Sequence, residues 1–267
     1  MRLAVKLAYF GDKFHGSQYQ PNVRTVEGEL LKALERFGIK NPNLRLAGRT
    51  DAGVHAYGQV AAFDCNDLIT PRMLNSELPE DITVWGWKKV DENFDPRKAK
   101  SRTYIYVIYA EDLDIKAIRD ALKFLYGTHD FLNFTKKFGE GESCVRTILK
   151  ADVRAEKDFL IFEIEGDSFT WNMIRCIVTA LIEVGTHRRD INWFKTLLCP
   201  EKHRERIEPA PPYGLILKEV KYENLEFEID DYAFKTLQNR IEERIRVSGV
   251  IYKLFSQFKK CGAFEPH

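Results

Sequence analysis

The chain has 267 residues, enough for one large domain or two smaller ones with a substantial hydrophobic core. Hydrophobic residues make up 44% and charged residues 30% of the sequence, as in ordinary globular proteins. The 41 Lys and Arg residues balance the 40 Asp and Glu residues, so net charge neither favours nor excludes a nucleic-acid partner. Basic residues gather in 88–102 and 187–206, which is compatible with a polyanionic ligand and equally with two solvated faces.

Several classes of protein are excluded by what the sequence lacks. No apolar run approaches the roughly 20 residues of a membrane span. The N-terminus begins with a strand-like segment rather than a targeting signal, and the five cysteines show no Cys-x-x-Cys pair, so a reducing, cytoplasmic location is expected. Cys199 and His203 alone cannot form a four-ligand zinc site. Neither a phosphate-binding P-loop nor a Gly-x-Gly-x-x-Gly fingerprint is present.

Hydrophobic periodicity predicts strands mixed with helices along the chain. We interpret this pattern as an α+β protein with two similar lobes of mainly antiparallel sheet flanked by helices, residues 1–108 and 109–222. Strands are predicted at 2–10, 59–63, 82–90, 101–109, 145–154, 159–166 and 215–222. Helices are predicted at 25–37, from Thr70-Pro71, at 114–125, at 169–184 and at 191–198, with Thr25 and Asp114 as N-caps.

The last segment, residues 223–267, has a different character. Leu237, Ile241 and Ile245 are spaced by four residues, as on the inward face of an amphipathic helix. Gly249 is expected to interrupt this helix, with a second helix after it. The segment is therefore predicted to be a helical extension, and its sequence indicates no role.

One motif, Gly166-Asp167-Ser168, resembles the opening of a class of serine esterases. In those enzymes the motif follows the first strand of a parallel α/β fold and works with a late Asp-x-x-His pair. Here it lies in the middle of the chain and no such pair follows, so a Ser-His-acid triad cannot be assembled. The sequence disfavours an esterase.

The densest group of polar residues lies between Leu46 and Ala56. This stretch contains Arg49, Thr50 and Asp51 between glycines, in a sequence that reads as a connection between two strands. Composition alone suggests a turn, because Asp bonds its own backbone and Gly tolerates positive φ. A functional reading needs support from elsewhere in the chain.

Two other positions are unusual. Tyr104 lies in the most β-prone segment and shares a face with Arg102 and Tyr106, which alone suggests cross-strand aromatic packing. Arg175 stands alone on a strongly apolar predicted helix. Its guanidinium must either extend to solvent or pair with an acid, because an unpaired buried charge is too costly.

Gly48 to Ala56 matches the signature Gly-Arg-Thr-Asp-x-Gly-Val-His-Ala in full, and the chain thereby resembles the TruA family of tRNA pseudouridine synthases. The resemblance extends over roughly residues 1–222. Thr170 and Asn172 depart from it, standing where leucine and histidine are usual. Supporting segments, in the expected order, are Gly11, Phe14, Gly16 and Gln18 with Thr25 to Leu30; Arg102, Tyr104 and Tyr106; His129 to Phe131; Ser168, Phe169, Met173 to Arg175 and Gly185; and Pro209, Ala210, Gly214 and Leu215.

The resemblance implies a fold, a reaction and a set of catalytic residues. It implies the pseudouridine synthase fold, with the active-site cleft between the lobes, and a homodimer that isomerises uridines at positions 38–40 of the tRNA anticodon stem-loop without a cofactor or metal. Asp51 would be the nucleophile or the carboxylate that stabilises a sugar cation. Arg175 would pair with Asp51 and favour its charged form. Tyr104 would lie against the target base and help to remove the proton from C5.

The resemblance also implies contacts with RNA. Arg49 would fill the space left when the target uridine turns out of its stack, or hold its phosphate. The alternative interpretation is a catalytically inactive tRNA-binding relative, which the presence of all three catalytic residues disfavours. Further expected RNA contacts are Thr50, His55, Arg102, Lys136, Lys137 and Leu215, with Arg188 and Arg189 as weaker candidates.

Overall fold

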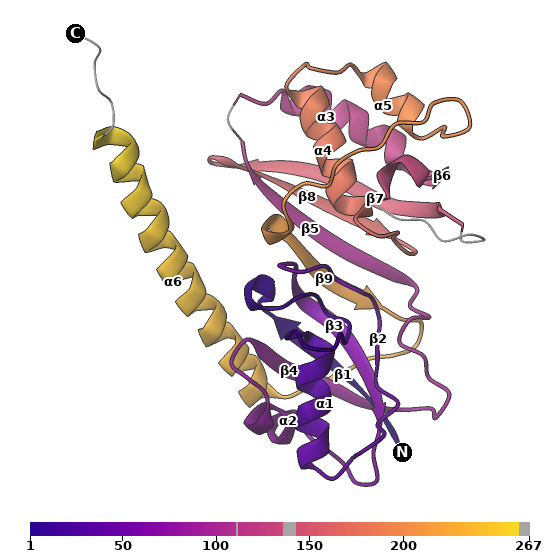
Figure 1. The fold of residues 1–267 in the computed structure, drawn as a ribbon, viewed down its shortest axis with the longest axis vertical. Helices are drawn as coiled ribbons and strands as arrows, with labels where there is room; N and C mark the ends of the chain where they lie inside the picture. Colours follow the sequence, from indigo (N-terminus) through magenta and orange to yellow (C-terminus); the bar gives the residue numbers. More distant parts are fainter. Residues whose placement is uncertain (111, 136–142, 262–267) are drawn as a thin grey trace.

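The computed structural model describes residues 1–110, 112–135 and 143–261 (Figure 1). Within them, ten strands form one sheet in the order β10-β4-β1-β3-β9-β5-β8-β7-β6, with β2 paired to β3. Every pairing is antiparallel except that of β9 with β3, so the predicted α+β class with a mainly antiparallel sheet is confirmed. The strands are β1 (Arg2–Tyr9), β2 (Arg45–Leu46), β3 (His55–Asp64), β4 (Ile82–Val90), β5 (Ser101–Tyr109), β6 (Gly127–Asp130), β7 (Val145–Glu156), β8 (Phe159–Gly166), β9 (Leu215–Lys221) and β10 (Glu228–Ile229).

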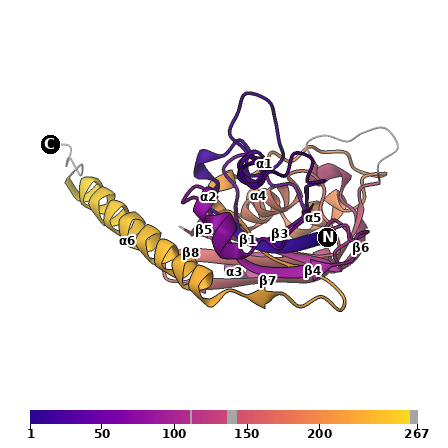
Figure 2. The same cartoon turned by 90° about the horizontal axis from the view of Figure 1, so that it is seen from below.

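Helices flank the sheet, with α1 and α4 on the same side of it (Figure 2). The predicted N-caps are confirmed: Thr25 Oγ1 accepts the Gly28 N–H at 3.1 Å, and Asp114 Oδ1 accepts the Ala117 N–H at 2.9 Å. The helices are α1 (Val26–Arg36), α2 (Pro71–Glu77), α3 (Ile115–Leu122), α4 (Met173–Gly185), α5 (Ile191–Leu197) and α6 (Asp231–Cys261), with 3-10 turns η1 (Gly11–Lys13), η2 (Lys123–Leu125), η3 (Leu132–Phe134) and η4 (Pro212–Gly214).

Strand β9 joins the early and late parts of the chain. It lies between β3 and β5, parallel to β3 and antiparallel to β5. Strand β3, which follows the Asp51 stretch, is thereby held one strand away from β5, which carries Tyr104. The sheet is continuous across this junction, and the division of the chain at residue 108 remains a prediction.

The C-terminal extension is one long helix, contrary to the sequence prediction. Helix α6 runs without a break from Asp231 to Cys261, and Gly249 does not interrupt it. A single glycine costs a helix only about 1 kcal/mol relative to alanine, which a long helix can absorb. The start of α6 packs on the body through Phe234 and Leu237 on Trp85, and farther along the helix the Tyr252 hydroxyl donates to Asp158 at 3.2 Å. The other side chains of the second half of α6 are largely exposed (Figure 1).

The helix predicted at 169–184 begins later than expected. Helix α4 starts at Met173, and its N-cap, Asn172, has a left-handed backbone with φ of 64°. Residues 169–172 are therefore an irregular segment before the helix. Asparagine is among the few non-glycine residues that adopt this conformation readily.

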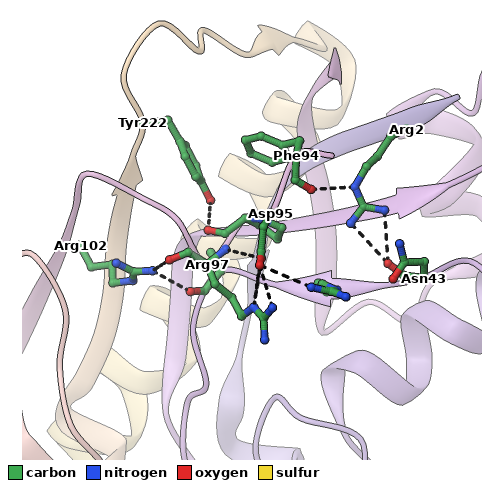
Figure 3. Close-up of polar contacts among 10 residues, drawn as sticks. Arg2, Asn43, Phe94, Asp95, Arg97, Arg102 and Tyr222 are labelled. Atoms are coloured by element: carbon green, nitrogen blue, oxygen red, sulfur yellow. Dashed lines mark hydrogen bonds and ion pairs between the residues drawn. The ribbon is translucent and has the colours of Figure 1, made fainter. Parts of the chain in front are cut away.

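The connection between β4 and β5 is fixed by side chains from distant strands (Figure 3). Arg2 Nε donates to the carbonyl oxygen of Phe94 at 2.8 Å, and the Tyr222 hydroxyl donates to that of Pro96 at 2.6 Å. Asp95 accepts from Arg97 Nη2 at 2.7 Å. These bonds give this loop one conformation beside the site described next.

Candidate active site

The Asp51 loop, residues 47–54, joins β2 to β3 and is fixed by buried hydrogen bonds to Tyr9 and Ser17. The Tyr9 hydroxyl lies 2.7 Å from Thr50 Oγ1. Ser17 Oγ accepts the Thr50 N–H at 2.8 Å, and the Ser17 N–H donates to the Thr50 carbonyl at 3.0 Å. Burial raises the pKa of Tyr9 to about 12, so this hydroxyl keeps its proton. Gly53 has φ of 82°, as the predicted turn requires, and the loop presents Asp51 in a fixed position.

Arg175, from the first turn of α4, pairs with Asp51 as predicted. Arg175 Nη1 lies 2.8 Å from Asp51 Oδ2, although 124 positions separate the two residues. Their side chains are 12% and 23% exposed, so each charge is partly desolvated and compensated by the other. Arg175 is itself anchored, because Nε donates to the Ala210 carbonyl at 2.6 Å. A charge-assisted bond of this kind is short and directional.

Asn172 explains how Arg175 is aimed. Its left-handed backbone turns the chain into α4, and its Oδ1 accepts from Arg175 Nη1 at 2.7 Å. Asn172 is 9% exposed. The position that departs from the histidine usual in TruA enzymes thus contacts the arginine directly, and Asn172 helps to orient it.

Trp171 is a second partner of Asp51 that the sequence analysis missed. Its indole Nε1 donates to Asp51 Oδ1 at 2.7 Å, and Trp171 is 50% exposed. Its carbonyl accepts from Thr135 Oγ1 at 3.1 Å. Because the segment reads as the start of an apolar helix, only its position next to Asn172 could have drawn attention to this tryptophan.

Tyr104 lies in the middle of the sheet on β5, bonded to β8 and β9. It is 7% exposed, and its ring packs edge-on against Phe169 with centroids 5.2 Å apart. Burial raises the pKa of Tyr104 well above its usual value, and the nearby Asp51 charge acts in the same direction. The phenol therefore keeps its proton.

A cavity of about 350 Å³ lies beside the Asp51 loop. Its size is in the usual range for small-molecule sites. It is formed by segments from both predicted lobes, since Gly48 and Tyr104 line it together with Ser168 and Phe169. Four arginines also line it: Arg45, Arg49, Arg97 and Arg102.

These arginines differ in what they contact. Arg102 is 8% exposed, and its guanidinium donates to the carbonyl oxygens of Asp167 at 2.7 Å and Ala47 at 3.1 Å, and to that of Arg97 (Figure 3). Arg102 thus holds the cavity wall and the Asp51 loop together. Arg49 is exposed and makes no hydrogen bond or ion pair with the residues that the structure describes, so its guanidinium is available to a ligand.

Three more residues predicted to contact RNA are buried or hydrogen-bonded within the protein. His55 Nδ1 accepts the Gly11 N–H at 3.0 Å, and burial lowers the pKa of His55, which favours a neutral imidazole. Thr50 is 7% exposed and bonded to Tyr9. Leu215 is 6% exposed, at the start of β9. All three help to shape the site, and their contact with RNA stays a prediction.

The remaining basic candidates lie elsewhere. Lys136 and Lys137 are outside the described residues. Arg188 pairs with Glu183 at 2.9 Å and Arg189 with Glu205 at 3.4 Å. Both arginines follow the C-terminal end of α4, whereas Arg175 is at its N-terminal end, about 20 Å away along the axis. The structure does not bring them to the Asp51 loop.

The part of the chain that the structure describes contains no group of three His, Cys, Asp or Glu side chains that could hold a metal ion. None of its helices is both long and apolar enough to cross a membrane.

Comparison with known proteins places the chain in a family. Residues 121–223 match the family model described as tRNA pseudouridine synthase. A protein of Archaeoglobus fulgidus named tRNA pseudouridine synthase A is 68% identical over 98% of this chain and 99% of that one. Proteins of the same name from Methanosarcina acetivorans and Pyrococcus furiosus are 50% and 39% identical, covering 92% and 96% of this chain and 94% and 96% of their own. A solved Cbf5-Nop10-Gar1 complex is a distant match, with a TM-score of 0.34 and 12% identity over 67% of this chain and 54% of that chain.

The identity with these relatives over nearly the full length puts the chain among the tRNA pseudouridine synthases. Within that class the near-full-length identities are decisive, and the chain belongs to the TruA family of tRNA pseudouridine synthases. The resemblance on which the sequence interpretation depends is confirmed.

Proposed function

We propose that this protein isomerises uridine to pseudouridine in the anticodon stem-loop of tRNA, with Asp51 as the reacting carboxylate and without a cofactor. As a TruA family member it is a tRNA pseudouridine synthase, an isomerase. The observation that carries the finer proposal is the Asp51 carboxylate itself, which is fixed on a rigid loop and bonded to Arg175 beside a cavity. The four described free cysteines suit a reducing cytoplasm, which we propose as the location.

The reaction needs a carboxylate but no external reagent. The N1–C1′ bond of uridine breaks, the uracil turns, and a C5–C1′ bond forms, while C5 loses a proton and N1 gains one. Asp51 can attack the nucleoside or stabilise the positive charge that develops on the sugar. Arg175 holds one carboxylate oxygen and compensates its charge, so that Asp51 is aimed before the substrate arrives.

Tyr104 is proposed to contact the uracil from the cavity wall. Its ring lines the cavity and is fixed by Phe169. Base–aromatic stacking contributes about 1–3 kcal/mol per base. Because its hydroxyl remains protonated, Tyr104 is assigned to holding and turning the base, and the C5 proton is left to another acceptor.

Arg49 is proposed to take the place of the target uridine in the RNA stack or to bind its phosphate. Turning a base out of a stem-loop costs a few kcal/mol, which such a contact offsets. Arg49→Ala should raise the KM for a stem-loop about tenfold and lower kcat less than threefold. Arg36→Ala, which alters an exposed arginine paired with Glu77, is the control. An unchanged KM for Arg49→Ala would contradict this role.

The exposed part of α6 supports the proposed homodimer. Large apolar patches on the surface mark interaction sites, and a second copy of the chain is the partner expected from the family. Val250→Glu should convert dimer to monomer in light scattering, whereas Leu68→Glu, on an exposed loop, should not. A monomeric wild-type protein would refute the homodimer. The exposed apolar residues of this part of α6 are Ile245, Val247, Val250, Ile251 and Leu254, each 46–69% exposed.

The deciding experiment treats a full set of unmodified tRNA transcripts with the purified protein and maps pseudouridine at each nucleotide. We expect modification confined to the anticodon stem-loop. Modification of another region would keep the enzyme class and refute the proposed target. Tight tRNA binding without any pseudouridine would instead support the inactive tRNA-binding relative.

A further inference from the structure

The two carboxylate oxygens of Asp51 have different partners. Oδ2 accepts from Arg175, which is 12% exposed and also bonded to the Ala210 carbonyl and to Asn172. Three acceptors thus fix the Arg175 guanidinium, and Oδ2 remains bonded to it. Oδ1 is the oxygen left for a nucleoside, and in the structure it accepts from the indole of Trp171.

Trp171 is held much less firmly than Arg175. It is 50% exposed and lies in the irregular segment before α4. Among the described residues, the bond to Asp51 is the one hydrogen bond that its indole makes. The ring can therefore move aside by rotation of its own side chain, without disturbing the helix or the sheet.

We propose that Trp171 is a place-holder for the target uridine, a positioning residue that caps Asp51 Oδ1 in the free protein and releases it when the flipped base enters. This inference depends on the proposed function. The indole is a flat ring with an N–H at its edge, similar in size and shape to a nucleobase. While it is bonded to Oδ1 it keeps the carboxylate aligned and shields it from water. Oδ1 can approach the nucleoside only after the indole has left that line of approach.

Two other roles make different predictions. In one, Trp171 keeps its bond throughout the reaction and permanently orients the carboxylate. In the other, Trp171 is a stacking platform that contributes to RNA affinity, as exposed aromatics often do. Only a place-holder is bonded to Asp51 without RNA and separated from it with RNA.

The first test observes the indole N–H directly by nuclear magnetic resonance of the full chain. Trp171→Phe identifies the Trp171 resonance, and Asp51→Ala defines its position without the bond. Saturating anticodon stem-loop should move the wild-type Trp171 resonance to the Asp51→Ala position. Trp193, whose Nε1 donates to Glu205 at 2.7 Å, is the matched control and should not move. A Trp171 resonance that keeps its free position in the RNA complex would overturn the proposal.

The second test separates KM from kcat in Trp171→Phe, which keeps a ring and loses the N–H donor. Since RNA no longer has to break a charge-assisted bond, KM should fall about three- to tenfold and kcat should stay within about threefold. A permanent orienting role predicts a fall in kcat with KM unchanged, and a stacking role predicts a rise in KM. Either result would overturn the proposal. Trp193→Phe should change neither constant.

The two proposals can fail separately. If the wild-type protein binds the stem-loop and forms no pseudouridine, the proposed function fails, and the resonance of Trp171 still reports whether RNA displaces the indole. If pseudouridine forms and the resonance does not move, the place-holder role fails alone.

Discussion

Arg175 and Arg102 are both largely buried arginines beside the Asp51 loop, and they use their guanidinium groups differently. Arg175 donates to a carboxylate, and Arg102 donates to three backbone carbonyls. The first contact orients the carboxylate that we propose reacts, and the second holds the wall of the cavity beside it. The comparison teaches that a buried arginine near a site is assigned by its acceptors, because proximity and burial are the same for both.

The largest effect on kcat is expected from removal of the Asp51 carboxylate, which is bonded to Arg175. Asp51→Ala should lower kcat at least about a thousandfold, because it removes the carboxylate that we propose reacts with the substrate. Stem-loop affinity should stay within about threefold and the protein should stay folded, as measured by filter binding and circular dichroism. Asp67→Ala, an exposed aspartate, is the control. Pseudouridine formation by Asp51→Ala at the wild-type rate would refute the assignment.

The next effect tests the chemical side of the comparison. Arg175→Leu should lower kcat about a hundredfold and change RNA affinity less than threefold, since its guanidinium contacts Asp51 rather than the solvent. Arg175→Lys should restore little, because an ammonium cannot reproduce the planar fork that reaches three acceptors. Equal losses of kcat and affinity, in kinetics and binding on the same samples, would show that Arg175 acts on RNA instead.

Arg102→Ala tests whether Arg102 stabilises the fold through its bonds to backbone carbonyl oxygens. Removal of this side chain leaves buried carbonyl oxygens without donors, so the free energy of unfolding should fall by about 3 kcal/mol in urea denaturation. Arg154→Ala removes an arginine that is 51% exposed and should cost less than about 0.5 kcal/mol. If Arg102→Ala is as stable as the wild type and binds RNA poorly, Arg102 is an RNA contact, as the sequence analysis expected.

The same contrast separates what the sequence could predict from what it could not. Strands 82–90 and 101–109 are observed with the predicted bounds, because alternation and β-branched residues are local signals. The residue pattern also showed that Arg175 needs solvent or an acid, while Asp51 as its partner was implied by the family resemblance. These inferences use the residue's own surroundings in the chain.

The contact between Trp171 and Asp51 had no such signal. The two residues are 120 positions apart, and the apolar residues near Trp171 continue the helical pattern of α4. The left-handed turn at Asn172 is stabilised by its bond to Arg175, a contact that forms only in the folded chain. The place of β9 between β3 and β5 is likewise set by long-range pairing. Sequence reasoning therefore found the catalytic candidates, and only the structure reveals how they are held.

The smallest effect concerns Asp95, which pairs with Arg45 and Arg97 of the cavity wall and should titrate without affecting the chemistry (Figure 3). Its hydrogen bond from Arg97 lowers the pKa of Asp95 to about 2, below the value near 3.9 expected in the unfolded chain. The stabilisation is therefore present above about pH 4 and is lost as pH falls through 4 toward 2. The full shift would correspond to about 2.5 kcal/mol. Arg97 is 60% exposed, so solvent screening reduces the expected cost of Asp95→Asn to about 1 kcal/mol at pH 7.

Urea denaturation from pH 7 to pH 3 should show that the difference in unfolding free energy between the wild type and Asp95→Asn becomes smaller. Glu223→Gln, which alters an exposed pair with Lys100, is the control. A difference that is constant over that range would mean that Asp95 acts through its shape rather than its charge.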